Sequence, residues 1–267
     1  MPELPEVQTV VADLKSKILN QKIISIQVLC AKIFELNINL IIDQVILDVW
    51  RRGKYIILNL ANGYLVVHLR MTGRFFVVPK NNNLQPIHQK HLHVIIELDN
   101  YFLLFQDQRQ FGRINFHSNL DWLEKKLGPE PLLQNFTINY LIDICKSSKK
   151  IKPLLLDQSK IAGLGNIYVD EVLWQAAVHP ATIANKISKV KINKIYDAIR
   201  TILQQAINMQ GTTFLSYAFD GNKKGNFLEY LKIFNRANMA CFACGHIVIK
   251  IKVAQRGTHI CPTCQKL

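Results

Sequence analysis

The chain has 267 residues, of which 49% are hydrophobic, and 33 Lys and Arg against 19 Asp and Glu give it a formal net charge of +14. This composition supplies enough apolar residues for folded cores and excludes a disordered or fibrous chain. The positive excess favours a polyanionic partner, and nucleic acid is the usual one. The length predicts about two domains. No signal-like leader and no apolar run of membrane-spanning length occur in the sequence, so we expect a cytoplasmic protein without a membrane partner.

The N-terminal half predicts one helix followed by strands. Apolar residues from Val7 to Ile18 recur at helical spacing, and Pro5 suits the first turn of a helix that ends near Asn20. The segments that follow are rich in β-branched and aromatic residues, and Asn62-Gly63 is a hairpin signal. Such spacing without intervening helices predicts an antiparallel sandwich or barrel. The expected strands cover residues 22–29, 45–50, 55–60, 64–69, 75–78, 93–98, 101–105 and 114–116.

The C-terminal half changes to a helical period after the Gly-Pro-Glu-Pro stretch at residues 128–131. Helices are predicted at 137–146, 166–175 and 188–209, with Thr137 and Ser188 as N-caps and Gly211 as a stop. The polar stretch 212–226 predicts a functional or mobile loop, because loops of that length are uncommon inside compact domains.

Four cysteines near the C-terminus have the spacing of a metal site. Two Cys-x2-Cys pairs supply a tetrahedral set of thiolates for one Zn²⁺, and a closed set leaves no position for water, so we expect a structural ion. Odd-numbered positions from Ile247 to Val253 are apolar and predict a strand with one apolar face, which leads to a turn at 255–258. Cys30 and Cys145 stand apart and are expected to be small buried hydrophobes. The predicted zinc ligands are Cys241, Cys244, Cys261 and Cys264.

The first residues offer a nucleophile. If the initiator Met1 is removed, Pro2 presents a secondary α-amine, and an α-amino group has a pKa near ~7.7–8.0, so part of it is unprotonated at neutral pH. Its attack on a sugar C1′ gives a cationic iminium that favours elimination, with Glu3 as the adjacent general acid or base. The alternative is that Pro2 and Pro5 only shape the entry into a helix, with Glu6 near its positive end.

Two further motifs have a functional and a structural interpretation. Gly163-Leu164-Gly165-Asn166 before a helix suits phosphate binding, although a plain tight turn is the commoner meaning of Gly-x-Gly. Met71, Arg109 and Phe111 suit a wedge that separates bases, although Met71 and Phe111 taken alone are more often core residues.

In this order and spacing, the motifs along nearly the whole chain resemble the formamidopyrimidine-DNA glycosylase family. The matching segments are 2–7 (Pro-Glu-Leu-Pro-Glu-Val), 51–55 (Arg-x-x-Lys-Tyr), 68–73 (His-Leu-x-Met-x-Gly), 90–93 (Lys-His-x-His), 109–112 (Arg-x-Phe-Gly), 128–132 (Gly-Pro-Glu-Pro-Leu), 165–168 (Gly-Asn-Ile-Tyr), 255–256 (Gln-Arg) and the four C-terminal cysteines.

The resemblance implies a multidomain α+β fold. It consists of an N-terminal antiparallel β-sandwich flanked by helices (1–127), a linker (128–133), a helix–two-turns–helix DNA-binding domain (134–230) with a lesion-capping loop (212–226), and a zinc-finger hairpin (231–267). It implies a monomer that binds duplex DNA carrying oxidised purines or abasic sites, and a bacterial, nucleoid-associated location.

The resemblance also implies the catalytic roles. Pro2 is then the Schiff-base nucleophile and Glu3 the proton donor for base loss. Lys54 assists β-elimination and touches phosphate, and Arg256 assists δ-elimination and clamps phosphate.

The same resemblance implies the DNA contacts. Asn166 fixes the backbone of the flipped nucleotide, His91 contacts DNA, and Glu171 braces the helix near the site. The wedge residues that fill the gap in the duplex are Met71, Arg109 and Phe111. The family's basic contact before Ile-Lys-Pro falls near Ser148, and we expect Lys149 or Lys150 to replace it.

The sequence departs from the family pattern at a few positions. Phe234-Asn235-Arg236 stands where the family often has Tyr-Gly-Arg, and Gln8 and Gln110 stand where charged residues are common; we expect little consequence. Two other functions stay open. The first is excision of oxidised pyrimidines, although relatives with that activity more often have glycine at the position of Leu4. The second is that of a non-catalytic zinc-ribbon protein, which would bind damaged DNA without cutting it.

Overall fold

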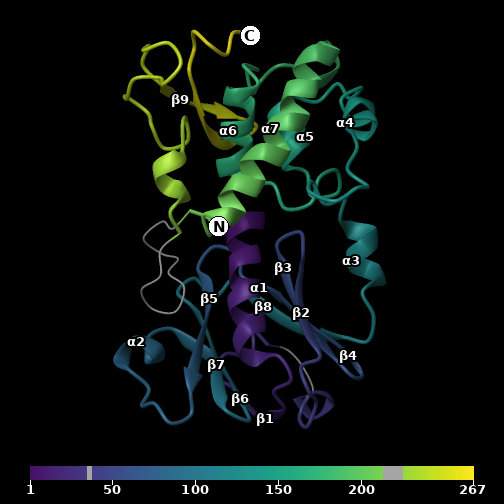
Figure 1. Cartoon of the computed structure of the whole chain (residues 1–267), viewed down its shortest axis with the longest axis vertical. Coiled ribbons are helices and arrows are strands. Elements are labelled where there is room, and N and C mark those ends of the chain that lie inside the picture. Colours follow the sequence, from purple (N-terminus) through teal and green to yellow (C-terminus); the bar gives the residue numbers. More distant parts are fainter. Residues whose placement is uncertain (35–37, 213–224) are drawn as a thin grey trace. The chain divides into compact units, whose positions relative to one another are not determined.

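The computed structural model describes residues 1–34, 38–212 and 225–267, and the chain divides into two compact units (Figure 1). Unit 1 comprises Met1–Leu123 and Gln210–Asn226, and unit 2 comprises Glu124–Met209 and Phe227–Leu267. The predicted domain boundaries stay predictions. The predicted capping loop lies outside the described residues except for Thr212, Gly225 and Asn226.

Unit 1 begins with helix α1 (Leu4–Ile18) and continues as two four-stranded antiparallel sheets, as predicted for the sandwich. Short helix α2 (Pro86–Gln89) lies between strands β5 and β6. The first sheet has the order β1 (Ile23–Val28), β6 (Leu92–Leu98), β7 (Tyr101–Asp107), β5 (Gly73–Pro79). The second sheet has the order β2 (Asp48–Arg52), β3 (Tyr55–Leu60), β4 (Gly63–His68), β8 (Arg113–His117).

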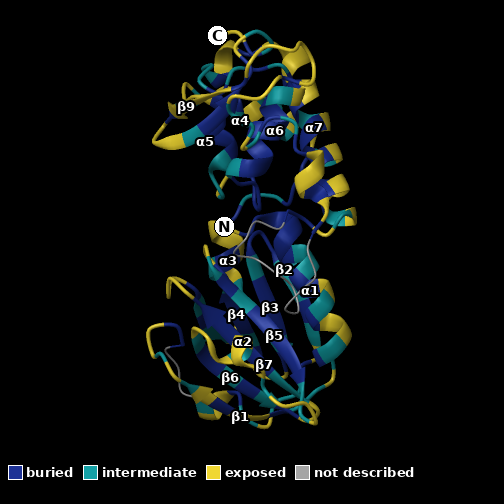
Figure 2. Ribbon diagram, turned by 90° about the vertical axis from the view of Figure 1, so that its left-hand side faces the viewer, coloured by how far each residue is buried: buried dark blue, intermediate teal, exposed yellow. Residues whose placement is uncertain are grey.

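One apolar core joins α1 to both sheets. Every second residue of β3, such as Ile56 and Leu58, enters this core together with Val7 and Leu14 of α1 and Phe105 of β7. The buried interior is dark blue in Figure 2. Because each fully buried aliphatic side chain contributes about 1.5–3 kcal/mol, this core holds α1 firmly against the sandwich.

The hairpin between β3 and β4 turns at Ala61 and Asn62, so the glycine of the predicted Asn62-Gly63 signal is the first residue of β4. Gly63 has φ +152° and pairs with Leu60, and a Cβ there would lie 2.5 Å from the carbonyl oxygen of His117 on the neighbouring strand. Glycine is therefore needed at the position where β4 begins beside its neighbouring strand β8.

Unit 2 is built on α6 (Asn166–Gln175) and α7 (Lys189–Asn208), which pack on each other. The caps predicted for two helices are present: Thr137 Oγ1 accepts from Tyr140 N at 3.1 Å, and Ser188 Oγ accepts from Lys191 N at 3.4 Å. The remaining elements are α3 (Asp121–Lys126), which spans the unit boundary, α4 (Ile138–Ile144), α5 (Ile151–Leu156), β9 (Ile249–Val253), β10 (Arg256–Ile260) and the 3₁₀ turns η1 (Ile38–Leu40), η2 (Ala184–Lys186) and η3 (Phe227–Tyr230).

The predicted apolar face of the C-terminal strand is wrong at its start. Val248 is fully buried, whereas Ile247 and Ile249 are 53% and 38% exposed. The reason is that Val248 packs against Ile233 and Cys241, while no further strand among the described residues joins the two-stranded hairpin. Among the described residues, no helix combines the length and the apolar character that a membrane span requires.

Candidate active site and zinc module

The start of α1 is buried and held by hydrogen bonds. Pro2 and Glu3 are buried, and Glu3 N donates to Glu6 Oε2 at 2.9 Å, as in a capping box. The other oxygen of the Glu6 carboxylate accepts from Thr212 N at 2.8 Å and from Thr212 Oγ1 at 3.0 Å. A Cβ on Gly211 would lie 2.8 Å from this oxygen, so glycine is needed beside it. Glu6 thus ties the first helix to the segment that follows α7.

Lys54 lies in the turn between β2 and β3, and an arginine connects this turn to α1. Arg51 donates from Nη1 to Gly53 O at 2.9 Å and from Nε to Gln8 Oε1 at 3.0 Å. The Lys54 side chain is buried within the described structure. Gln8, one of the departures from the family pattern, therefore has a defined role in placing Lys54 beside the N-terminus.

The α-amine of Met1 has a pKa below its ordinary value, chiefly because burial disfavours its charged form. The carboxylates of Glu3 and Glu6 oppose this effect, and the charges of Lys54 and Arg109 add to it. These couplings show that unit 1 brings the predicted residues Glu3, Lys54 and Arg109 together around the N-terminus. An α-amine in this environment has a larger nucleophilic fraction at neutral pH than a solvent-exposed one.

Met71, Arg109 and Phe111 form one exposed cluster, not part of a core. Met71 and Phe111 are each 42% exposed. Arg109 Nη1 lies 3.0 Å from Met71 Sδ, and its guanidinium lies 4.9 Å from the centre of the Phe111 ring. Two exposed apolar side chains joined by a cation have the character of a wedge for a stacked duplex.

Asp107, which is fully buried, holds the loop that carries this wedge. Its carboxylate accepts from Arg109 N at 3.1 Å, from Gly112 N at 2.7 Å and from the Thr72 hydroxyl. Its own backbone N–H donates to His91 O at 3.0 Å, and the His91 side chain is exposed. One carboxylate therefore fixes the wedge loop, and its backbone links that loop to the predicted DNA contact.

In unit 2, Arg256 lies at the tip of the β9–β10 hairpin. The two turn residues, Ala254 and Gln255, have φ values of +46° and +64°, as in the type I′ turn that suits a twisted two-residue hairpin loop. Arg256 pairs with Val253 and its side chain is exposed. The turn presents this arginine to solvent, as a phosphate clamp requires.

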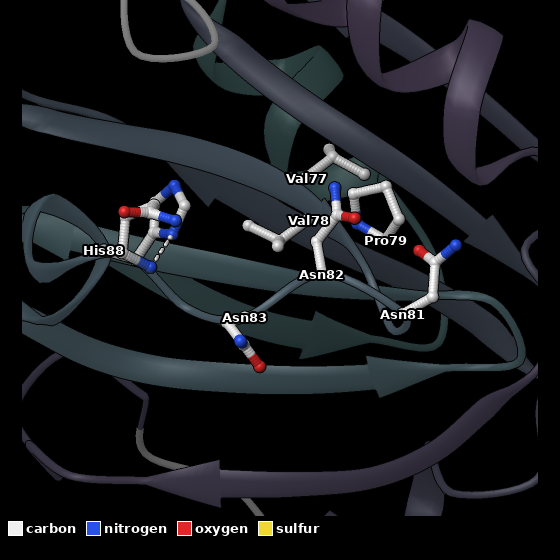
Figure 3. Close-up of a pocket in the computed structure, with 8 residues that line it drawn as sticks. Val77, Val78, Pro79, Asn81, Asn82, Asn83 and His88 are labelled. Atoms are coloured by element: carbon white, nitrogen blue, oxygen red, sulfur yellow. Dashed lines mark hydrogen bonds between the residues drawn. The ribbon is translucent and has the colours of Figure 1, made fainter.

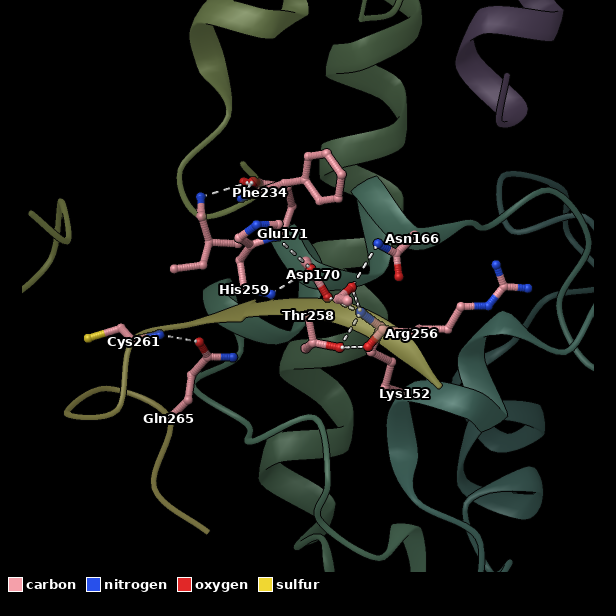
Figure 4. A network of polar contacts seen from close by, with 12 residues as sticks. Lys152, Asn166, Asp170, Glu171, Phe234, Arg256, Thr258, His259, Cys261 and Gln265 are labelled. Carbon is pink, nitrogen blue, oxygen red and sulfur yellow. Dashed lines mark hydrogen bonds and ion pairs between the residues drawn. The ribbon is translucent and has the colours of Figure 1, made fainter. Parts of the chain in front are cut away.

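A buried polar network holds the hairpin to helices α5 and α6 (Figure 4). Lys152 Nζ donates to Asp170 Oδ1 at 2.6 Å and to Thr258 Oγ1 at 2.8 Å, and Lys152 and Asp170 are both fully buried. Asn166 Nδ2 donates to Gly257 O at 3.0 Å. Because an amide nitrogen carries two hydrogens, Asn166 keeps a second donor for a ligand.

Glu171 joins α6 to the segment before the zinc module. It accepts from the backbone N–H groups of Lys232, Ile233 and Phe234 at 2.8–2.9 Å. Burial raises the pKa of the Glu171 carboxyl, and the three donors oppose this shift. Phe234 therefore lies in a turn that Glu171 holds.

The predicted phosphate contact Lys149 has an exposed side chain, and its backbone O accepts from Ala184 N.

The four predicted zinc ligands converge, with all four Sγ atoms within 4.8 Å of one another. The Sγ atoms of Cys241 and Cys264 are 4.0 Å apart, and those of Cys244 and Cys261 are 3.4 Å apart. Both distances are close to the ~3.8 Å edge of a sulfur tetrahedron with Zn–S bonds of about 2.3 Å. Trp174 Nε1 lies 3.4 Å from Cys241 Sγ and can stabilise its thiolate. The donor set and spacing fit one structural zinc ion.

A pocket of about 470 Å³ on unit 1 lies apart from these groups (Figure 3). It is lined by the end of β5, by three consecutive asparagines from Asn81, and by His88, whose Nδ1 accepts from Gln85 N. None of the predicted site residues lines it.

Comparisons with known proteins agree with this geometry. Three family models match: the formamidopyrimidine-DNA glycosylase N-terminal domain over residues 1–114, the formamidopyrimidine-DNA glycosylase H2TH domain over 127–217, and the zinc finger found in FPG and IleRS over 241–267. The chain belongs to the formamidopyrimidine-DNA glycosylase family.

Individual members of the formamidopyrimidine-DNA glycosylase family match over their full length. The chain is 40% identical to that of Streptococcus pyogenes, covering 100% of this chain and 99% of the relative, and 43% identical to that of Protochlamydia amoebophila, covering 100% of each. Among solved structures, MutM in complex with DNA containing carbocyclic 8-oxo-G has a TM-score of 0.90 at 37% identity, with 100% of each chain covered. Lactococcus lactis Fpg bound to abasic-site DNA has a TM-score of 0.91 at 37% identity, covering 99% of this chain and 100% of that one.

Sequence reasoning missed two structural groups. The buried pair Lys152 and Asp170 was not predicted, although a single lysine in the apolar run 151–156 is a signal that it has a buried partner. The role of Asp107 was also missed; its position two residues before Arg109, where it can accept that residue's N–H, is the signal.

We expect one zinc ion per chain by elemental analysis. Cys244→Ser should remove most of the zinc and lower the unfolding temperature, because metal binding contributes apparent folding free energy. Cys30→Ser, which lies outside the cluster, should retain the ion. Equal zinc content in the two variants would contradict the assignment.

We expect Glu6→Gln to destabilise unit 1 by about 1–3 kcal/mol, because an amide nitrogen would face donors that now reach a carboxylate oxygen. The measurement is denaturant unfolding, with the exposed Glu229→Gln as the matched control. A loss no larger than that of the control would show that the bonds to Glu3 and Thr212 add nothing to stability.

Proposed function

We propose that this protein is a bifunctional DNA glycosylase and abasic-site lyase of base-excision repair. Its substrates are oxidised purines in duplex DNA, chiefly 8-oxoguanine and formamidopyrimidines. The observation that carries the proposal is the pairing, within unit 1, of a buried Pro2 beside Glu3, with Lys54 near enough for its charge to act on the terminal amine, and an exposed wedge of Met71, Arg109 and Phe111. Solved relatives are named as complexes with 8-oxo-G, Fapy-dG and abasic-site DNA.

The wedge accounts for access to the lesion. A base inside a duplex cannot be reached by an enzyme's reactive groups, so the nucleotide is flipped out. Met71 and Phe111 then occupy the vacated space, and Arg109 between them carries the charge that faces the phosphates. Asn166, Lys149 and His91 hold the backbone, and these contacts make binding sensitive to salt.

The chemistry begins once Met1 is removed. The unprotonated Pro2 nitrogen attacks C1′ of the damaged nucleotide, and the bond from C1′ to the base breaks as Glu3 supplies a proton to the leaving base. The proton carried by the attacking nitrogen passes to O4′ as the C1′–O4′ bond breaks and the sugar ring opens, which leaves an iminium that joins Pro2 to C1′. The buried site raises the free-amine fraction, and the neighbouring carboxylate is positioned by α1 itself.

Strand cleavage follows from the iminium. Loss of a proton from C2′ expels the 3′ phosphate, which is the β-elimination that Lys54 assists. A second proton loss expels the 5′ phosphate, which is the δ-elimination that Arg256 assists while it clamps phosphate. Water then hydrolyses the imine and regenerates Pro2. The zinc ion has a structural part, since its four thiolates leave no position for substrate.

We also propose that the protein is a monomer of the bacterial cytoplasm. Its net positive charge and its binding to DNA would associate it with the nucleoid. The relatives that match over their full length are bacterial.

The test is cleavage of a duplex that carries 8-oxoguanine opposite cytosine. The unchanged protein should release the base and cut the strand. Glu3→Gln should slow base release by about 10²–10⁴-fold, the usual contribution of a general acid, yet still cut a duplex with a preformed abasic site. Pro2→Gly should lose most cutting of both substrates.

Other outcomes separate the alternatives. If the protein cleaved a duplex that carries an oxidised pyrimidine but did not cleave the 8-oxoguanine duplex, its activity would be excision of oxidised pyrimidines. Tight binding of damaged DNA without any strand break, unchanged by Pro2→Gly, would assign a non-catalytic binding protein.

We expect Lys54→Gln to move the pH midpoint of the single-turnover rate upward. The charge of Lys54 lowers the pKa of the Met1 amine. We expect the same direction at the Pro2 amine that Met1 removal leaves, so loss of the Lys54 charge should raise that pKa and leave less free amine at a given pH. The rate itself should also fall, so the midpoint is the quantity to compare. Lys15→Gln, on the exposed side of α1, should leave the midpoint in place. An unmoved midpoint in Lys54→Gln would contradict the placement of this lysine beside the amine.

A further inference from the structure

Seven exposed lysines gather on two neighbouring segments of unit 2, and the proposed catalytic chemistry uses none of them. We call these segments the lysine surface: residues 143–150, between the end of α4 and the start of α5, and residues 183–197, from the start of η2 into α7. Its lysines are Lys146, Lys149, Lys150, Lys186, Lys189, Lys191 and Lys194.

The two segments lie side by side through their backbones. Ala184 N donates to Lys149 O at 2.9 Å, Asn185 N donates to Ser147 O at 3.1 Å, and Lys150 forms an isolated antiparallel bridge with Ile183. Helices α4 and α7, which carry the ends of the two segments, are in contact. The lysines are therefore gathered by the fold, although residues 151–182 separate the two segments in the sequence.

Little negative charge balances this surface. Its acidic residues are Asp143 and Asp197, and Asp143 already pairs with Lys146 at 2.8 Å, so five positive charges are in excess. Lys152 is different from the seven, because it is fully buried and paired with Asp170.

The lysines at the start of α7 are unfavourably placed for the helix. Lys189 and Lys191 lie in the first turn of α7, which holds no acidic residue and where the helix already carries partial positive charge. Lys191 and Lys194 are three residues apart on the helix surface and repel each other. Since the charges oppose folding locally, a polyanion bound to this surface would relieve them.

We infer that the lysine surface binds the sugar-phosphate backbone of duplex DNA away from the lesion, as a sequence-independent extension of the DNA contact. This inference rests on the proposed function. Lys149, already expected to contact phosphate, lies at one end of the surface, and Lys186 and the lysines of α7 continue it. Lysine ammonium groups on flexible stems can follow the phosphates of a duplex, which carries about one charge per 1.7 Å of its axis. Contacts to phosphates do not read the base sequence.

The surface has a specific role in this arrangement. It would lengthen the stretch of duplex held at one time and raise affinity for undamaged DNA during the search for a lesion. It would leave the chemical step unchanged, because the seven lysines hold neither the nucleophile nor its proton donor.

The test compares two variants that remove equal charge. The test variant replaces lysines of η2 and α7 by glutamine: Lys186→Gln, Lys189→Gln, Lys191→Gln and Lys194→Gln. The control variant replaces lysines of unit 1: Lys15→Gln, Lys17→Gln, Lys22→Gln and Lys32→Gln. The binding constant for undamaged duplexes of about one and about three helical turns is measured against salt concentration, and circular dichroism checks that both variants fold.

The magnitude of the slope of log K against log salt falls by about 0.9 for each phosphate that the protein no longer neutralises. We expect the test variant to reduce this slope by about 2–4 on the long duplex and little on the short one, with single-turnover excision at saturating enzyme unchanged. The control should reduce it by less than about 1 on either duplex. The inference would be overturned if the test variant had the same slope as the control variant on the long duplex. It would also be overturned if the test variant reduced the slope equally on the long and the short duplex.

Two further results are informative. Loss of binding to vesicles of anionic lipid, with the DNA slope unchanged, would assign the surface to a membrane and overturn the inference. Absence of excision by the unchanged protein would count against the proposed function alone, since the slope on undamaged DNA still tests the lysine surface.

Discussion

The buried carboxylate of Glu6 fixes the place where the proposed chemistry happens. Chain termini are usually frayed, yet the start of α1 is held because Glu6 accepts from the Glu3 backbone on one side and from Thr212 on the other. A nucleophile at a terminus is useful only if it is held near attack geometry, which can supply several kcal/mol of a barrier. Core contacts of α1 hold the same segment, and Arg51 connects the Lys54 turn to α1 through Gln8.

In unit 2 the corresponding constraint is the ion pair of Lys152 and Asp170. Burying two charges costs several kcal/mol per ion unless each gains good partners, so this pair is a weak argument for stability as such. It is better understood as a geometric device. Lys152 also binds Thr258, and Asp170 accepts from His259 N, so the root of the hairpin is fixed while its tip with Arg256 stays exposed. The zinc ligands secure the other end of the same hairpin.

The elements that the sequence predicts well are those with strong periodicity or caps. Helices α1, α6 and α7 and most strands follow the expected ranges, because apolar spacing and the caps of Thr137 and Ser188 are local signals. Helices α2, α3 and α5 are too short to show a period and went unpredicted. The burial of Val248 between exposed isoleucines depends on which residues the zinc module packs against, which strand alternation does not encode. Met71 and Phe111 lie on separate loops that the Asp107 carboxylate holds through Thr72 and Gly112, and their exposure is not encoded by apolar character, which alone favoured a core position.

Borohydride trapping on a duplex with 8-oxoguanine opposite cytosine, followed by mapping of the crosslinked residue, tests whether Pro2 is the nucleophile. We expect a covalent protein–DNA adduct whose DNA is attached to Pro2 at the N-terminus of a chain that lacks Met1. Pro2→Gly should strongly reduce the adduct, whereas Lys15→Gln should leave it intact. An adduct on a lysine side chain, or none from a chain shown to begin at Pro2, would contradict the N-terminal mechanism.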